Sequence, residues 1–276
     1  MSEWKTLIGR VSLFPSYPQA GQPQIMIGQP SLARASALDI FKTVWGEDPD
    51  TFQKEANPLA PSMAMGRRGE LMAACSVQPN RIDISLNPAG PAVETVEPIF
   101  NVIDDTQLLH SGLSQIIGRV ADVSAPQPVS RVALFVQAIN LQPETAEANA
   151  VLMTAVPPKY RLALADEEAF VLQIGRRAAS STEPDLMLNL LDKWSVERFQ
   201  LIRFAMPQAG ISQSNTPSDL VQTFDYMGAS IGFDYNTMPA KRSLTPGEQS
   251  KILLETLVHG SRAQNEYQLG LEGFQP

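Results

Sequence analysis

One stretch, Val129–Leu141, constrains the fold of this chain more than any other feature of its sequence. It reads Val-Ser-Arg-Val-Ala-Leu-Phe-Val-Gln-Ala-Ile-Asn-Leu and is rich in the β-branched and aromatic residues that favour strands. Successive side chains of a strand point to opposite faces, so one face would be apolar and the other mixed. The apolar face would carry Val132, Leu134, Val136 and Ala138, and the mixed face Arg131, Phe135, Gln137 and Ile139. The stretch therefore predicts a long strand at the centre of a sheet.

Shorter segments on both sides of this stretch also have the character of strands. Arg81–Leu86 alternates apolar with polar residues, and Gln78-Pro79-Asn80 would turn the chain into it. Such alternation predicts a sheet with one polar face, which is either wet or a covered functional surface. The other predicted strands are Thr6–Phe14, Gln24–Gly28, Glu70–Val77, Val151–Val156, Tyr160–Ala165, Ala169–Ile174, Leu186–Leu191 and Arg198–Ala205.

Four helices are predicted from apolar spacing and capping residues. The first runs from Ser31 to Trp45 and stops at Gly46, and a long one follows Pro88–Pro91 and reaches about Val123. Two more begin at Thr216-Pro217-Ser218-Asp219 and Thr245-Pro246-Gly247-Glu248, where threonine would be the N-cap and a carboxylate would occupy N3. The last of them would end near Gly260.

These elements predict an α+β fold in which mostly antiparallel sheets pack against long helices. Strands before, between and after the helical segments suggest two related β-α-β arrangements, although no sequence repeat is evident. The boundary would fall within 142–158, which gives an N-terminal half, 1–142, and a strand-rich C-terminal half, 143–276. One continuous domain is the alternative.

The composition excludes several classes of protein. The 276 residues include 29 acidic and 21 basic side chains, a net charge of −8 without any basic run, which argues against a direct nucleic-acid partner. No window approaches the roughly 18 apolar residues that span a membrane, and the first ten residues lack the apolar core of a signal peptide. The single cysteine, Cys75, excludes an intramolecular disulfide framework. We therefore expect a cytoplasmic protein.

The central strand and the strands before it carry a resemblance. Arg131-Val132-Ala133-Leu134, preceded by the strand pair around Ser76–Ile82 and a helix, resembles a sporadically distributed bacterial family of uncharacterised proteins over roughly residues 70 to 200. That family has a glutamine-proline-aspartate turn, a helix and then a strand of the form Arg-Val-Gly-Leu-Arg-Tyr-x-Asn. Here Phe135 replaces its arginine, Val136 its tyrosine, and Asn140 comes two positions late. The resemblance implies no activity, and it points to mobile-element, toxin-neutralising (antitoxin-like) or phage-defence contexts.

A search for catalytic motifs returns none. The chain lacks a phosphate-binding Gly-x-x-x-x-Gly-Lys-Ser/Thr, a dinucleotide-binding Gly-x-Gly-x-x-Gly, a Gly-x-Ser-x-Gly and a His-Glu-x-x-His. With only His110 and His259, a histidine-rich metal site is excluded, while an all-carboxylate site stays open. His110 would lie on an exposed helix flank, His259 at a helix C-terminus, and Cys75 in the core. We therefore predict no catalytic residue, no metal and no cofactor.

Two groups of residues are candidates for binding. Arg67-Arg68, in a loop between Gly66 and Gly69, and Arg176-Arg177, after a strand ending at Gly175, could grip a phosphate or carboxylate. Solvated strand ends would look the same. The aromatic and apolar residues of the C-terminal tail could bind a partner, although a loosely docked edge strand or a frayed terminus would also explain them. They are Tyr267, Leu269, Leu271 and Phe274.

Two hypotheses about function follow. The first is a non-enzymatic interaction protein, such as an inhibitor, an immunity protein or an assembly component, which would bind another protein and could form homo-oligomers. The second is a protein that handles a small anion or a nucleotide, with enzymatic activity left open, through Arg67, Arg68, Arg176 and Arg177. We favour the first, because anion sites usually add glycine-rich loops or helix N-termini that follow strands.

Overall fold

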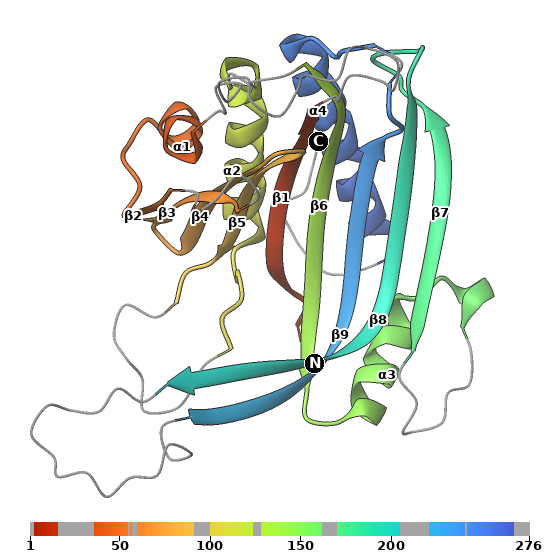
Figure 1. Ribbon diagram of the computed structural model, residues 1–276. Helices are drawn as coiled ribbons and strands as arrows, with labels where there is room; N and C mark the ends of the chain where they lie inside the picture. The colour runs from red at the N-terminus through yellow and green to blue at the C-terminus, as the bar shows by residue number, and fades with distance from the viewer. Residues whose placement is uncertain are drawn as a thin grey trace, which may run out of the picture.

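The computed structural model contains one nine-stranded antiparallel sheet with helices on one of its faces (Figure 1). It describes residues 3–15, 36–54, 56, 60–90, 100–123, 128–161, 170–204, 221–240 and 242–267. The strand order is β2-β3-β4-β5-β1-β6-β9-β8-β7. The strands are β1 Lys5–Pro15, β2 Thr51–Gln53, β3 Ser62–Arg68, β4 Leu71–Gln78, β5 Arg81–Pro88, β6 Val129–Gln142, β7 Val171–Ala179, β8 Met187–Phe204 and β9 Val221–Thr237. The helices are α1 Ala37–Trp45, α2 Thr106–Arg119, α3 Thr145–Ala155 and α4 Pro246–Glu266.

Strand β6 lies at the centre, as its sequence predicts. It pairs with β1 on one side and with β9 on the other, in both cases antiparallel. Its apolar face is in the core, where Val132, Leu134, Val136 and Ala138 are each 3% exposed or less. The opposite face carries the partly exposed Arg131, Phe135 and Gln137.

The predicted fold class is wrong in its helices and in its repeating unit. The helices are 9, 14, 11 and 21 residues long, so the large sheet, and not a set of long helices, dominates the described structure. In place of two β-α-β arrangements, each half has one strand, one helix, a run of antiparallel strands and a second helix, the run being β2 to β5 in the first half and β7 to β9 in the second. The order β3-β4-β5-β1 is mirrored by β7-β8-β9-β6, and the two series meet at the β1–β6 pair. The halves 1–142 and 143–276 therefore share a single sheet.

All four helices pack on the same face of this sheet. Helix α1 contacts β3 and β4, α2 contacts β1 and β5, α4 contacts β6 and β9, and α3 contacts β6, β8 and β9. Close approach of α2 depends on Gly9, because a Cβ atom there would lie 2.8 Å from the Leu109 side chain. The far ends of β8 and β9 bend away from the sheet, and Phe100 contacts both, with ring centroids 5.4 Å from Phe199 and 5.4 Å from Tyr226 (Figure 1).

Local capping signals place two helix ends correctly. Gly46 ends α1 in the left-handed conformation with φ of 74°, and its N–H donates to the Lys42 carbonyl. Thr245 and Glu248 form the reciprocal capping box at the start of α4. The described part of α1 begins after Ser36, whose side chain accepts from the Leu38 N–H, while residues 31–35 lie outside the described ranges.

Several predicted elements have a different structure. Residues 151–155 belong to helix α3, because Ala148, Leu152 and Ala155 form a buried stripe at helical spacing that outweighs the apolar run. The helix predicted from Thr216 is replaced after residue 220 by strand β9, and residues 205–220 lie outside the described ranges. The two strands predicted over 186–191 and 198–205 merge into the single strand β8. Helix α2 begins only at Thr106, and helix α4 continues past Gly260. The predicted Gln24–Gly28 strand and most of Tyr160–Ala165 also lie outside the described ranges.

Among the described residues, no helix is both long enough and apolar enough to cross a membrane.

Candidate functional site

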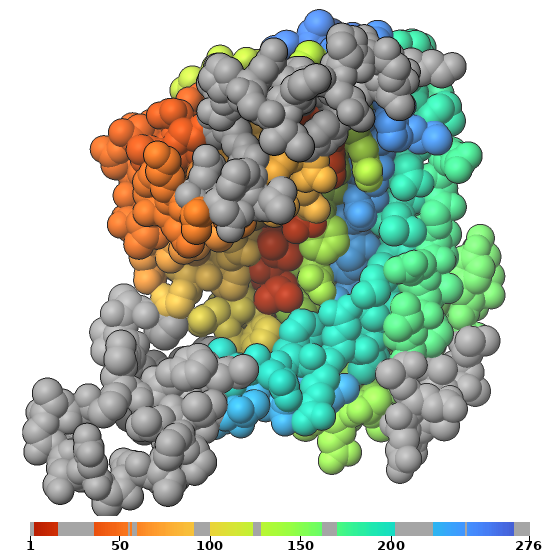
Figure 2. Space-filling model, viewed as in Figure 1, coloured from red at the N-terminus to blue at the C-terminus, as the bar shows by residue number. Residues whose placement is uncertain are grey.

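The sheet face opposite the helices is the most distinctive surface of the described structure. We call it the uncovered face, because the described helices all pack on the other side. Figure 2 looks onto it, with atoms of β1, β6, β9 and β8 at the bottom of a hollow in the middle of the view. Its side chains come from alternate positions of each strand, for example Arg10, Ser12 and Phe14 on β1.

Three arginines meet on this face where β5, β1 and β6 lie side by side. Arg10, Arg81 and Arg131, which we call the arginine cluster, come from β1, β5 and β6. The Arg131 and Arg81 guanidinium carbons lie 4.7 Å and 5.4 Å from the centroid of the Phe14 ring. Arg10 lies over the Phe135 ring at 5.0 Å. Such stacking holds guanidinium groups flat while their N–H edges stay available.

Among the described residues, Asp83 on β5 is the carboxylate in ion-pair contact with the cluster. Its Oδ1 accepts from Arg81 Nε at 2.7 Å and from the Ser12 hydroxyl at 2.5 Å, and Arg10 Nε lies 3.8 Å away. The Nε atoms of Arg10 and Arg131 are buried and have no hydrogen-bond partner among the described residues. Burial lowers the pKa of Arg10, against the opposing effect of Asp83, with smaller contributions from Arg81 and Asp234. The cluster therefore has more cationic donors than acceptors.

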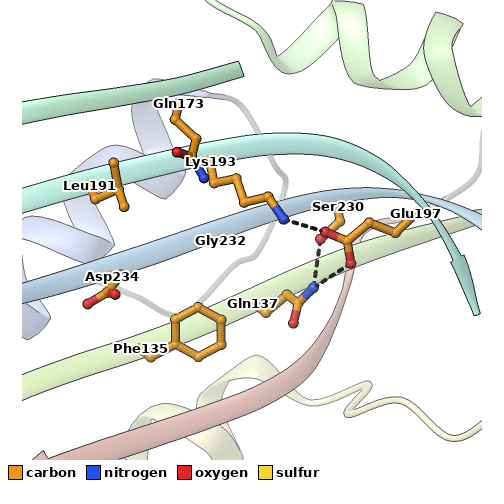
Figure 3. Close-up of a pocket in the computed structure, with 9 residues that line it drawn as sticks. All are labelled: Phe135, Gln137, Gln173, Leu191, Lys193, Glu197, Ser230, Gly232 and Asp234. Carbon is orange, nitrogen blue, oxygen red and sulfur yellow. Dashed lines mark hydrogen bonds and ion pairs between the residues drawn. The ribbon is translucent and has the colours of Figure 1, made fainter. Parts of the chain in front are cut away.

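A pocket, which we call the Gly232 pocket, adjoins the cluster on the β6, β9 and β8 side (Figure 3). Its volume is about 330 Å³, and Gly232 of β9 lies at its centre, between Phe135 of β6 and Lys193 of β8. Leu191 and Asp234 border one end. A Cβ atom on Gly232 would lie 3.6 Å from the Phe135 ring, so this glycine leaves room that any other residue would fill. Phe135 is common to the pocket and the cluster.

The other end of the pocket is a closed polar network around Glu197. Its carboxylate accepts from Lys193 Nζ at 2.9 Å, from the Ser195 hydroxyl at 2.6 Å and from Gln137 Nε2 at 3.4 Å. Gln137 also donates to the Ser230 hydroxyl at 2.8 Å. Burial alone would raise the pKa of Glu197, but the hydrogen bonds from Ser195, Lys193 and Gln137 together lower it. Glu197 is therefore an anion at neutral pH, and Lys193 compensates its charge.

The two predicted arginine pairs do not share a site. Both lie within strands, Arg67-Arg68 on β3 and Arg176-Arg177 on β7, so their expected places in a loop and after a strand end are wrong. Six strands lie between β3 and β7, and the seven strand spacings of about 4.8 Å put the pairs about 34 Å apart along the sheet. Two pairs at this separation cannot grip one anion together.

Strand alternation also divides each arginine pair between the two faces. Arg67 and Arg177 lie on the uncovered face, opposite Met72 and Asn189 of the neighbouring strands. Arg68 stacks over Phe41 of α1 at 5.0 Å and contacts Glu47 at 3.5 Å on the helix side. Arg176 donates to the buried Asp192 at 2.6 Å. Arg67 itself donates to the carbonyls of Gly69 and Gly90.

The tail residue that the structure describes, Tyr267, has its side chain in the core. It is 7% exposed, stacks on Phe233 with ring centroids 6.2 Å apart, and donates to Asp192 at 2.8 Å. Its ring and hydroxyl are therefore engaged within the protein. The other three, Leu269, Leu271 and Phe274, lie outside the described residues.

The remaining residues considered in the sequence, Cys75, His259 and His110, are buried or half-buried. Cys75 is buried and burial raises the pKa of its thiol, which confirms the prediction of a core residue. His259 lies within α4 and not at its end, so a capping role is wrong, and burial lowers its pKa. His110 is half-buried on α2, where burial likewise lowers its pKa. In the described part of the chain, no group of three or more histidine, cysteine or acidic residues is arranged to hold a metal ion.

Sequence reasoning missed the arginine cluster, although its signal was present. Arg81 and Arg131 lie on strand faces that the alternation marks as polar or mixed, and Arg10-Val11-Ser12 has the same alternation. What the sequence lacked was the strand order that makes β5, β1 and β6 neighbours. As it stands, the arrangement can bind an anion, through guanidinium groups held against aromatic rings.

Comparison of the chain with protein-family models, curated proteins and solved structures finds no match in any of the three, and the resemblance to the sporadically distributed bacterial family stays a prediction.

Proposed function

We propose that this protein is a non-enzymatic interaction component. Its partner is another protein, which docks by an acidic patch of the partner's own surface onto the uncovered face of the sheet. The observation that carries the proposal is the arginine cluster, in which three guanidinium groups face one directly contacting carboxylate and two buried Nε atoms have no described partner. Charge complementarity therefore favours a partner that presents aspartate or glutamate side chains.

The surroundings of the cluster support a protein partner. Aromatic and arginine side chains are the residues that most often dominate the binding energy of protein interfaces. Here Phe14, Phe135 and the three arginines form one contiguous surface on β1, β5 and β6. A nucleic-acid partner is disfavoured, because the net charge of the chain is −8.

The proposal extends to the biological context. Inhibitors, immunity proteins and antitoxins act by covering a partner, which suits a preformed surface without catalytic groups. A buried, free Cys75 thiol is in line with a reducing compartment, and we place the protein in the cytoplasm.

Site-specific photo-crosslinking in the cells that encode the protein would test where a partner docks. A photoreactive phenylalanine derivative replaces Ser85 or Gln173 on the uncovered face, and Leu254 on α4, which is 48% exposed, as the matched control. We expect one adduct of the same mass from both uncovered-face positions and none from Leu254. The partner is then identified, purified and recombined with the protein, and Arg81→Glu should weaken the complex.

The position of the adduct decides the proposal. Adducts from Leu254 alone, or equally from both faces, would contradict docking on the uncovered face. Binding of the purified partner that is unaffected by Arg81→Glu and by salt would contradict an acidic partner, because screening weakens charge-dependent association.

The pocket favours a second candidate, a protein that binds a small anionic metabolite. Its volume of about 330 Å³ is at the lower end of ligand-sized pockets, and Arg10 lies beside it over Phe135. A thermal-shift screen against nucleotides and phosphorylated metabolites checks this, and stabilisation abolished by Arg10→Gln is the expected result. A flat response throughout would reject it.

A further inference from the structure

We propose that the arginine cluster and the Gly232 pocket act as two adjoining seats, which bind one carboxylate side chain of the docked partner and the uncharged side chain next to it. This inference rests on the proposed function and states which chemistry the site selects.

The carboxylate seat is centred on Arg10, whose side chain is 31% exposed and whose buried Nε has no hydrogen-bond partner among the described residues. Arg131, stacked on Phe14 at 4.7 Å, adds positive charge further along β6. A guanidinium group carries five N–H donors in a planar fork, which matches the two oxygens of a carboxylate. Asp83 does not meet this demand, because its Oδ1 already accepts from Arg81 and Ser12. An external carboxylate would pair with the exposed part of the Arg10 side chain.

The second seat favours an uncharged group because its charges already have partners, Lys193 with Glu197 inside the pocket and Asp234 with the charge of Arg10 at its edge. Lys193 and Glu197 pair at 2.9 Å, and Gln137 bridges Glu197 and Ser230. Figure 3 shows these groups turned toward one another at one end of the pocket, with Phe135 and Gly232 beside the open space. A charged occupant would lose hydration without gaining a free counter-ion there. An apolar or amide side chain can fill the space over Gly232 without that cost.

The two seats are adjacent because they share the Phe135 ring. Arg10 lies over this ring at 5.0 Å, and the same ring borders the pocket. In the register of the sheet, Phe135 is opposite Arg10 on β1 and opposite Asp234 on β9. Strand β6 therefore lies between Arg10 and Gly232, and the two strand spacings, about 10 Å, are within the reach of neighbouring side chains of a single segment.

Short blocked dipeptides added to the full-length protein test the inference without the partner. The probe is N-acetyl-glutamyl-leucinamide, and the comparison probes are N-acetyl-glutaminyl-leucinamide, which lacks the charge, and N-acetyl-glutamyl-glycinamide, which lacks the side chain. Binding is followed by NMR chemical shifts, with the Gly232 amide as reporter of the pocket. We expect saturable shifts for the first probe and at least tenfold weaker binding for the uncharged probe.

Variants separate the two seats. Arg10→Gln should weaken binding of both glutamate probes about tenfold, while Arg177→Gln, on the same face at the far edge of the sheet, should leave both unchanged. Gly232→Ala, whose methyl group would make ordinary contacts at 3.6 Å and 3.9 Å, should weaken the leucine probe and spare the glycine probe. Unchanged backbone shifts away from the site confirm that each variant is folded.

Two outcomes overturn the inference. Equal binding of the glutamate and glutamine probes would remove the carboxylate seat, and a Gly232→Ala variant that weakens both glutamate probes equally, or neither, would remove the pocket seat. Either result leaves the proposed function standing if crosslinks still form from the uncovered face. Loss of those crosslinks would instead reject the proposed function itself.

Discussion

At the scale of single residues, the carboxylate of Asp192 is a buried negative charge in the described core that needs hydrogen-bond donors around it. It is 0% exposed and accepts from Arg176 at 2.6 Å, from the Tyr235 hydroxyl at 2.6 Å and from the Tyr267 hydroxyl at 2.8 Å. These bonds tie β7, β9 and the end of α4 to β8. Burial and the neighbouring Asp192 raise the pKa of both tyrosines, so they remain donors at neutral pH.

We expect Asp192→Asn to destabilise the protein strongly. The amide keeps the shape of the carboxylate but removes the negative charge that compensates Arg176. Its NH2 group is itself a donor, and it would face the groups that donate to the carboxylate, Arg176 and the two tyrosine hydroxyls. The free energy of unfolding should fall by about 2 kcal/mol, because buried tyrosine donors lose their acceptor while Arg176 itself is half-exposed. Urea unfolding measures it. Asp225→Asn is the control, because Asp225 pairs with Arg198 at the surface and should cost less than about 1 kcal/mol. Equal costs would contradict this account.

A second prediction concerns the thiol of Cys75. The residue is 0% exposed on β4, and burial raises its pKa, so the reactive thiolate is scarce. Ellman's reagent at pH 8 should therefore release no colour from the native protein and one equivalent after unfolding in urea. Rapid reaction of the native protein would show that β4 is accessible.

At the scale of elements, the start of α4 is stabilised by a charged capping box. Arg242 donates to Glu248 at 3.0 Å, and the Thr245 N–H donates to it at 2.7 Å. The Arg242 hydrogen bond, followed by the bond from Thr245, lowers the pKa of Glu248 from 4.5 to about 2. A lowered carboxyl pKa means that the stabilisation is complete above pH 4.5 and disappears as the pH falls toward 2.

This pH dependence gives the third prediction. The side-chain carboxyl of Glu248 should titrate by NMR with a midpoint near 2. Glu248→Gln should lower the stability at pH 7 and match the wild type below pH 2, because the charge is then lost in both. Glu147→Gln, in the first turn of α3, is the control and should have little effect at either pH. A Glu248 midpoint above 4 would contradict the described contacts.

At the scale of the whole molecule, the β1–β6 pair joins the two halves into one sheet. One hydrophobic core runs through both, from Val11 and Leu13 of β1 to Val132 and Leu134 of β6 and on to Phe233 of β9. Separating the halves would expose the apolar faces of β1 and β6 together with their backbone hydrogen-bonding groups. The two halves should therefore unfold together.

Tryptophan fluorescence can check this cooperativity. Trp4 and Trp45 report on the first half, and Trp194, which is fully buried, reports on the second. We expect the fluorescence and far-UV circular dichroism transitions in urea to coincide in a Trp194→Phe variant. They should also coincide in a Trp4→Phe/Trp45→Phe double variant, because neither half has a separate equilibrium. Two midpoints in either variant would indicate independent halves.

Sequence reasoning succeeded where the decisive interactions are local. The stop at Gly46, the capping box at Thr245 and the central strand β6 all depend on residues a few positions apart. It failed where local preference and tertiary packing disagree. Residues 151–155 read as a strand because of their apolar run, yet the packing of α3 against β6, β8 and β9 makes them helical.

The candidate site was predictable only in part. The alternation of Arg81–Leu86 and of Val129–Leu141 marked two polar or mixed faces, which lie on the uncovered face. The two arginine pairs that the sequence marked as candidates lie near opposite edges of the sheet, on β3 and β7. Within each pair, one side chain lies on each face. Adjacent residues of a strand point in opposite directions, so neighbours in sequence were poor evidence for a shared site.

By itself, the sequence determined the faces of β5 and β6 on which side chains lie, the helix ends at Gly46 and Thr245, and the burial of Val132, Leu134 and Val136, because these follow from short-range patterns. Only the tertiary structure decided that β5, β1 and β6 are neighbours, and hence that Arg10, Arg81 and Arg131 meet. The physical reason is that strand order is set by packing between segments far apart in the chain, and no local pattern records it.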